Sequence, residues 1–186
     1  MNMRACLALL LLLSAPACAR AEEQAVKIKA ALSSAAGYAV PEGWTEEFSL
    51  NQGDSQSLIS MDLHAIKIRL SGGAGSRYKT AGNYLAGLEA RSKGGKPPEK
   101  AGTAIVSGMR VVIYRREVAV SLPLPGTGGP ATFAQEEFCA VPAGKNFIIL
   151  SYSYGDPVPD PSYDGLGAWR KFLKDFHVLK AGAKAK

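Results

Sequence analysis

The residues of this chain best suited to nucleophilic chemistry are Cys139 and the two histidines, His64 and His177. A thiol becomes a strong nucleophile when a histidine within hydrogen-bond reach takes its proton. Neither histidine stands in a local motif with the cysteine, and Cys139 lies within a strand-like segment, 133–141. A small thiol in such a segment is typical of a buried core position. We therefore expect Cys139 to be a core residue, with nucleophilic hydrolysis as the alternative.

A second possible source of chemistry is the adjacent pair of carboxylates, Glu136 and Glu137. Acid–base hydrolysis uses two carboxylates that share one cleft but differ in environment. Neighbouring residues of a strand point to opposite faces of the sheet, so these two can share a cleft only if a bulge realigns them. We expect the protein not to be an enzyme, and an envelope hydrolase that uses Cys139, Glu136 or Glu137 is the alternative.

Metal and nucleotide chemistry have less support. A zinc site needs three or four ligands, and the scattered histidines and cysteine make a poor set. His64 shares a strand face with Ile66, which predicts a hydrogen-bonded core or edge histidine. The glycine-rich segment 71–76 lacks both the GxGxxG and the GxxxxGK[ST] spacings of phosphate-binding loops. The sequence predicts a flexible connection at 71–76, and neither a metal site nor a cofactor.

Two loops rich in glycine and proline are candidate contact sites for a binding protein. They span residues 72–77 and 122–130. Loops carried on a rigid sheet often hold the residues that bind a partner. The candidate contact residues are Gly72, Gly73, Arg77, Pro125 and Gly128.

The first residues have the layout of a secretory signal peptide. Arg4 supplies the positive region, residues 5–13 are apolar, and Ala17-Cys18-Ala19 matches the small-x-small pattern of signal peptidase. The apolar run is far shorter than the ~20 residues that a permanent transmembrane helix needs. The sequence predicts a signal peptide over residues 1–19 with cleavage after Ala19, and no transmembrane helix after cleavage.

Cys18 leaves a second class of signal open. A lipoprotein signal also ends in small residues before a cysteine, and that cysteine is lipidated and becomes the new N-terminus. Ala15 is tolerable three residues before Cys18, whereas Pro16 fits the pattern poorly. The expected location is therefore the periplasm or the extracellular space, with a lipid anchor on Cys18 as the alternative.

The charge of the chain bears on its partners. The formal net charge is +6, and removal of the signal peptide takes away one cation, Arg4. Basic residues are scattered, so a solvated surface with weak attraction to anionic partners is expected. Nucleic acid binding would need a denser basic face with base-reading positions. We expect an envelope protein, a wall polymer or a lipid as the partner, and no nucleic acid.

The spacing of apolar residues predicts a sheet built mostly from hairpins. Strands joined by short turns pair antiparallel, and a segment apolar on both faces, 146–150, predicts a central strand covered on both sides. The fold class expected is α+β, a mainly antiparallel sheet with helices on both faces. The predicted strands are 44–50, 60–70, 103–106, 110–120, 131–141 and 146–154.

Helices are predicted on either side of the later strands. Thr80 is a suitable N-cap for a helix that ends at Ser92. A closing helix with Asp160 as its N-cap and Pro161 at its first position carries an apolar stripe through Phe176. Residues 20–36 are expected to be a lead-in or short helix, 37–180 a single domain without disulfides, and 181–186 a flexible basic tail.

This order of elements resembles the PsbP-like α/β/α sandwich. That fold is shared by the extrinsic photosystem II subunit, a eukaryotic Ran-binding protein and small bacterial envelope lipoproteins of the DcrB group. The matching parts are Val40-Pro41-Glu42-Gly43-Trp44, the helix at 80–92, and the closing stretch 169–176. The resemblance implies a binding or accessory subunit rather than an enzyme. It carries over no site residue.

Overall fold

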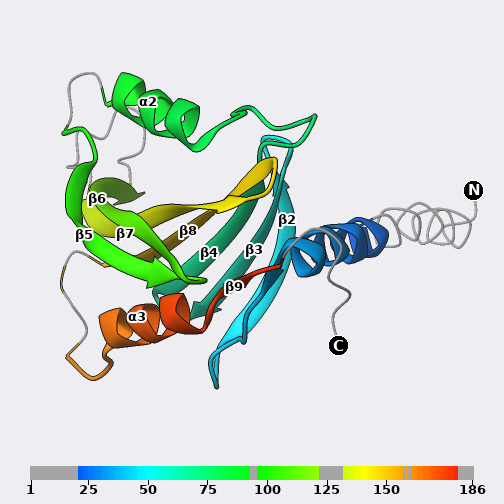
Figure 1. Cartoon of the computed structure of the whole chain (residues 1–186). Coiled ribbons are helices and arrows are strands. Elements are labelled where there is room, and N and C mark those ends of the chain that lie inside the picture. The colour runs from blue at the N-terminus through cyan, green and yellow to red at the C-terminus, as the bar shows by residue number, and fades with distance from the viewer. Residues whose placement is uncertain (1–20, 93–95, 122–131, 157, 159–160, 180–186) are drawn as a thin grey trace, which may run out of the picture.

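A sheet of seven antiparallel strands in the order β2-β3-β4-β8-β7-β6-β5 forms the centre of the molecule (Figure 1). The computed structural model describes residues 21–92, 96–121, 132–156, 158 and 161–179. The strands are β2 (Thr45–Asn51), β3 (Asp54–Met61), β4 (His64–Ser71), β5 (Glu99–Val106), β6 (Met109–Ser121), β7 (Thr132–Ala143) and β8 (Asn146–Tyr154).

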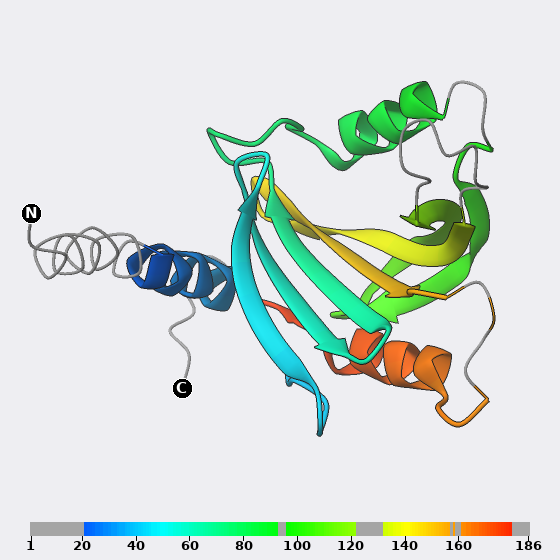
Figure 2. The same ribbon diagram turned by 180° about the vertical axis from the view of Figure 1, so that it is seen from behind.

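Helices cover both faces of this sheet. The helix α2 (Ala81–Arg91) lies on one face, and α3 (Gly165–Asp175) lies on the opposite face (Figures 1 and 2). The expected fold class, a mainly antiparallel α+β structure with helices on both sides, is confirmed. None of the helices in the described part of the chain is long and apolar enough to cross a membrane.

The middle strand β8 supplies both hydrophobic layers. Its residues alternate between the faces, so Phe147 and Ile149 pack with α2 while Ile148 and Leu150 pack with α3. The layer under α3 is the larger and contains the fully buried Trp169. The sequence prediction of a central strand covered on both sides is confirmed.

Residues 21–35 are helical and belong to the larger layer. Ile28 and Leu32 of this segment are buried, which anchors it against the same core as α3. The strands β1 (Ala36–Gly37) and β9 (His177–Val178) pair antiparallel, so the end of the helix at 21–35 lies beside the last described strand (Figure 2).

The strand predicted at 60–70 is confirmed only from residue 64 onward, because two strands occupy this region. They are β3 and β4, joined by a tight turn in which Asp62 has a φ of 49°. The polar stretch 52–57, which lies outside the predicted strands, is mostly the first half of β3. Serines make this half-strand look like a loop, yet Ser57 is fully buried and donates a hydrogen bond of 2.6 Å to Glu46.

The helix α2 agrees with its prediction, whereas the start of α3 does not. The hydroxyl of Thr80 accepts a hydrogen bond of 3.1 Å from the backbone N–H of Asn83, as an N-cap does. The true N-cap of α3 is Asp164, whose carboxylate accepts a hydrogen bond of 2.8 Å from the N–H of Gly167. Pro161 lies in a turn before the helix, and Asp160 is outside the described residues.

Two hairpin turns of the same kind allow a matched test of backbone packing. Gly53 and Gly108 have φ angles of 82° and 76°, and each follows a residue that also has positive φ. A Cβ at Gly53 would overlap the backbone of Gly75, whereas a Cβ at Gly108 would meet nothing within 4 Å.

We predict that Gly108→Ala lowers the free energy of unfolding by about 1 to 2 kcal/mol, the cost of the left-handed conformation alone. Gly53→Ala should lower it by at least about 2 kcal/mol more, because the backbone must also shift. Denaturant titration of both variants measures the difference. Equal losses would show that the close approach of Gly53 and Gly75 does not matter to stability.

Candidate functional site

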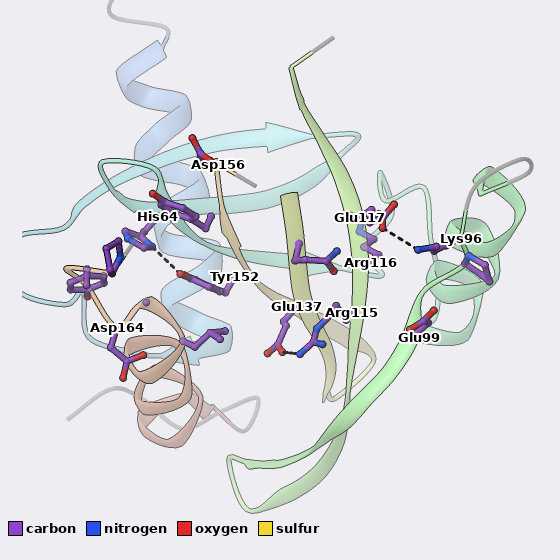
Figure 3. A pocket seen from close by; sticks show the side chains of 17 residues that line it. His64, Lys96, Glu99, Arg115, Arg116, Glu117, Glu137, Tyr152, Asp156 and Asp164 are labelled. Carbon is purple, nitrogen blue, oxygen red and sulfur yellow. Dashed lines mark hydrogen bonds and ion pairs between the residues drawn. The ribbon is translucent and has the colours of Figure 1, made fainter. Parts of the chain in front are cut away.

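A cavity of about 730 Å³ opens at one end of the sheet, beside the first turn of α3 (Figure 3). Its walls come from segments far apart in the chain: the start of β4, the end of β8, the middle of β6 and the beginning of β7. The antiparallel register places these strand positions next to one another. Tertiary structure alone therefore assembles this cavity.

One wall of the cavity is aromatic. The ring of His64 lies 4.6 Å from the ring of Tyr154 and 4.8 Å from that of Tyr163, measured between centroids. Nδ1 of His64 and the hydroxyl of Tyr152 share a hydrogen bond of 2.8 Å. His64 is only 3% exposed, so the prediction of a hydrogen-bonded core histidine is confirmed.

The first turn of α3 fixes this aromatic wall. Gly165 lies so close to the His64–Tyr152 pair that a Cβ there would overlap the Tyr152 hydroxyl. Glycine at this position therefore lets the helix approach the pair directly. On the other side, Nε1 of Trp44 donates a hydrogen bond of 3.2 Å to the hydroxyl of Tyr163.

Tyr152 is a hydrogen-bonding group and not a base at neutral pH. Burial raises the pKa of its phenol to about 12, and the nearby Tyr163 and Asp164 add to the effect. The phenol therefore stays protonated over the neutral range. Its hydroxyl holds His64 in place, and its ring stacks on Trp169 at a centroid distance of 6.3 Å.

A buried carboxylate lies beside the aromatic wall. Glu137 of β7, whose side chain is 4% exposed, forms ion pairs with Arg115 of β6 at 2.9 Å and Arg170 of α3 at 2.6 Å. Both arginines are about half exposed. A buried charge is costly unless it is paired, so the two arginines make this position possible. The three residues also join the sheet to α3.

Glu136 and Glu137 point to opposite faces of the sheet, as the sequence predicts. Glu136 lies on the α2 side and forms an ion pair of 2.5 Å with Arg116, whose guanidinium lies over the ring of Phe138. No bulge is present at this point of β7, where the pairing with β8 runs without a shift. The structure therefore does not bring these two carboxylates together as an acid–base pair.

Cys139 is a core residue, as expected. It is 0% exposed and packs in the larger hydrophobic layer. Burial raises the pKa of its thiol to about 12, with only Arg170 opposing the effect. A buried thiol with a raised pKa stays protonated and is a poor nucleophile.

The predicted contact residues that the structure describes, Gly72, Gly73 and Arg77, do not line the cavity. His64 begins β4 and Ser71 ends it, so the two lie about 23 Å apart at a rise of ~3.3 Å per residue. The loop that contains Gly72, Gly73 and Arg77 starts at this far end. The Lys79 ammonium donates a hydrogen bond of 2.9 Å to the carbonyl of Gly73, so a contact within the same loop stabilises it. The other two predicted positions, Pro125 and Gly128, lie outside the described residues.

Sequence reasoning singled out His64 and Glu137 but missed the tyrosines and Asp164 of the cavity wall. Tyr152 and Tyr154 carried one usable signal, because residues two apart on a strand share a face. Tyr163 and Asp164 carried none, since their positions depend on where α3 begins. Within the described residues, no group of three or more His, Cys, Asp or Glu side chains is placed to hold a metal ion.

Comparisons with known proteins add little to this geometry. No protein-family model and no curated protein matches the chain. The crystal structure of LpqN, which is involved in cell envelope biogenesis of Mycobacterium tuberculosis, is similar at a TM-score of 0.36 and 10% identity, covering 77% of this chain and 82% of that one. This likeness is too weak to support an argument. The PsbP-like resemblance stays a prediction.

We predict that Glu137→Gln lowers the free energy of unfolding by roughly 2 kcal/mol, because it weakens one charged hydrogen bond, to Arg115, and one ion pair, to Arg170, of a buried group. The matched control is Glu117→Gln, which alters the exposed pair with Lys96 at 3.5 Å and should cost less than about 0.5 kcal/mol. Denaturant titration measures both. A small loss in both variants would mean that the buried ion pairs contribute nothing net.

We also predict that the Cys139 thiol resists alkylation in the folded protein. Iodoacetamide at mildly alkaline pH should leave the peptide that contains Cys139 unmodified, since the thiol is buried and protonated. The same reagent in denaturant should modify it fully. Peptide mass mapping reads out the result, and rapid labelling of the folded protein would contradict the assigned core position.

Proposed function

We propose that this protein is an exported, non-catalytic binding domain that holds a small ligand, or a protruding group of a larger envelope partner, in the cavity beside α3. The observation that carries the proposal is the preformed aromatic wall around His64. Ligand sites are usually concave, largely apolar and preformed, with a few fixed polar groups. A cavity of about 730 Å³ falls within the size range of such sites.

Binding fits the chemistry of the cavity better than catalysis does. The phenol of Tyr152 has a raised pKa, which makes it a weak acid and keeps it protonated at neutral pH. Glu137 is committed to two arginines. Catalytic acids and bases instead have pKa values near the working pH and stand ready to exchange protons. These observations support a role in which the polar groups orient a ligand and do not react with it.

Export is part of the proposal and rests on the signal at residues 1–19, which are outside the described residues. The alternative is a lipoprotein tethered through Cys18, which would hold the same cavity at a membrane surface. Replacing Cys18 with serine distinguishes these states. A tethered protein would become soluble, whereas a cleaved one would keep its location.

We predict that the uncharged dye N-phenyl-1-naphthylamine binds in the cavity and fluoresces there. The test variant is Leu166→Ser, because Leu166 lines the cavity from the first turn of α3 and is 50% exposed. Loss of its apolar surface should weaken dye binding about fivefold, the equivalent of ~1 kcal/mol of buried apolar area.

The matched control is Leu50→Ser, because Leu50 is 51% exposed but lies on the edge strand β2 away from the cavity. This variant should bind the dye as the unmodified protein does. Absence of dye binding, or equal loss in both variants, would overturn the proposed site. Fluorescence titration with the purified protein gives the dissociation constants.

A further inference from the structure

The cavity carries a charge opposite to that of the whole chain. The chain has a formal net charge of +6, whereas five carboxylates and three cations line the cavity, a net charge of −2. Counting the ion-pair partners that lie behind the wall, Glu136 and Arg170, leaves this value unchanged because their charges cancel. An acidic cavity in a basic protein favours a positively charged occupant.

Every cation in the cavity wall is already engaged by a carboxylate. Lys96 pairs with Glu117 at 3.5 Å, Arg115 with Glu137 at 2.9 Å, and Arg116 with Glu136 at 2.5 Å. An anionic ligand would have to compete with these partners. The cavity therefore offers an anion little uncompensated positive charge.

Three carboxylates of the wall remain without a cation among the described residues: Glu99, Asp156 and Asp164. Asp156 accepts a hydrogen bond of 2.7 Å from the backbone N–H of Val158, and Asp164 accepts one from Gly167. Each bond uses one carboxylate oxygen and neutralises no charge. These carboxylates are the source of the negative excess.

The aromatic wall lies within this negative region. Figure 3 shows Asp156 and Asp164 on either side of His64, whose ring contacts those of Tyr154 and Tyr163. The face of an aromatic ring attracts a cation within ~6 Å of its centroid, most strongly where water is displaced. Rings and carboxylates at one wall are thus complementary to a charged group that also has apolar surface.

We propose that the ligand of this cavity is an organic cation, an amine or quaternary ammonium with an apolar body, whose charged group lies at the aromatic wall between Asp156 and Asp164. The inference rests on the proposed function, because it specifies the ligand of the same cavity. The apolar body would lie toward Leu166, which lines the cavity and keeps an exposed apolar surface.

The experiment displaces bound N-phenyl-1-naphthylamine with three probes of similar shape. They are benzyltrimethylammonium, the uncharged tert-butyl benzyl ether and the anion benzylsulfonate. The cation should bind about tenfold more tightly than the ether, which corresponds to a typical cation–π and charge contribution. Equal affinities, or tighter binding of the ether or the sulfonate, would overturn the inference.

Variants then test the source of the preference. The double variant Asp156→Asn and Asp164→Asn keeps both side-chain acceptors, and asparagine remains a good N-cap for α3. It should weaken binding of benzyltrimethylammonium roughly three- to tenfold and leave that of the ether unchanged. Equal loss for both probes would overturn the inference, because it would indicate a damaged cavity and not a lost charge.

The matched control removes two carboxylates elsewhere, Glu89→Gln on α2 and Asp175→Asn at the far end of α3. It changes the net charge of the protein by the same amount and should leave the affinity for benzyltrimethylammonium unchanged. Equal weakening in control and test variants would overturn the inference in favour of a general charge effect. Failure of the dye itself to bind would instead overturn the proposed function, and this inference with it.

Discussion

The burial of β8 on both faces is the constraint on which the rest of the structure depends. The side chains of Phe147 and Ile149 are buried on one face of the sheet, and those of Ile148 and Leu150 on the other. Both sets can be shielded from water only if helices cover both faces of the sheet. The position of β8 in the middle of seven strands, α2 on one face and α3 on the other, follows from this requirement.

The cavity forms where this double burial ends. After Leu150, β8 continues as Ser-Tyr-Ser-Tyr. The ring of Tyr152 stacks on Trp169 while its hydroxyl shares a hydrogen bond with His64, and the ring of Tyr154 contacts that of His64. Gly165 allows α3 to start directly over Tyr152, so the helix closes one side of the cavity. The same strand thus organises the core in its first half and the candidate site in its second half.

Side chains alternate between the two faces of a strand, and this alternation also decides on which face each buried carboxylate lies. Glu136 and Glu137 leave β7 in opposite directions, and each meets an arginine from the neighbouring strand β6. These pairs compensate the buried carboxylates and also engage two of the cations that line the cavity. The carboxylates that lack such partners stand at the rim, which explains how a basic protein acquires an acidic cavity.

Local sequence patterns were enough to predict the α+β class, the helix α2, the covered central strand, and the core positions of His64 and Cys139. These features depend on local periodicity and capping, which neighbouring residues encode. Only the tertiary structure decided the turn at Asp62, where a polar strand resembles a loop, and the cavity itself. The cavity joins His64, Glu137 and Asp164 through strand register and the close approach of Gly165. Such contacts between distant segments leave no local pattern in the chain.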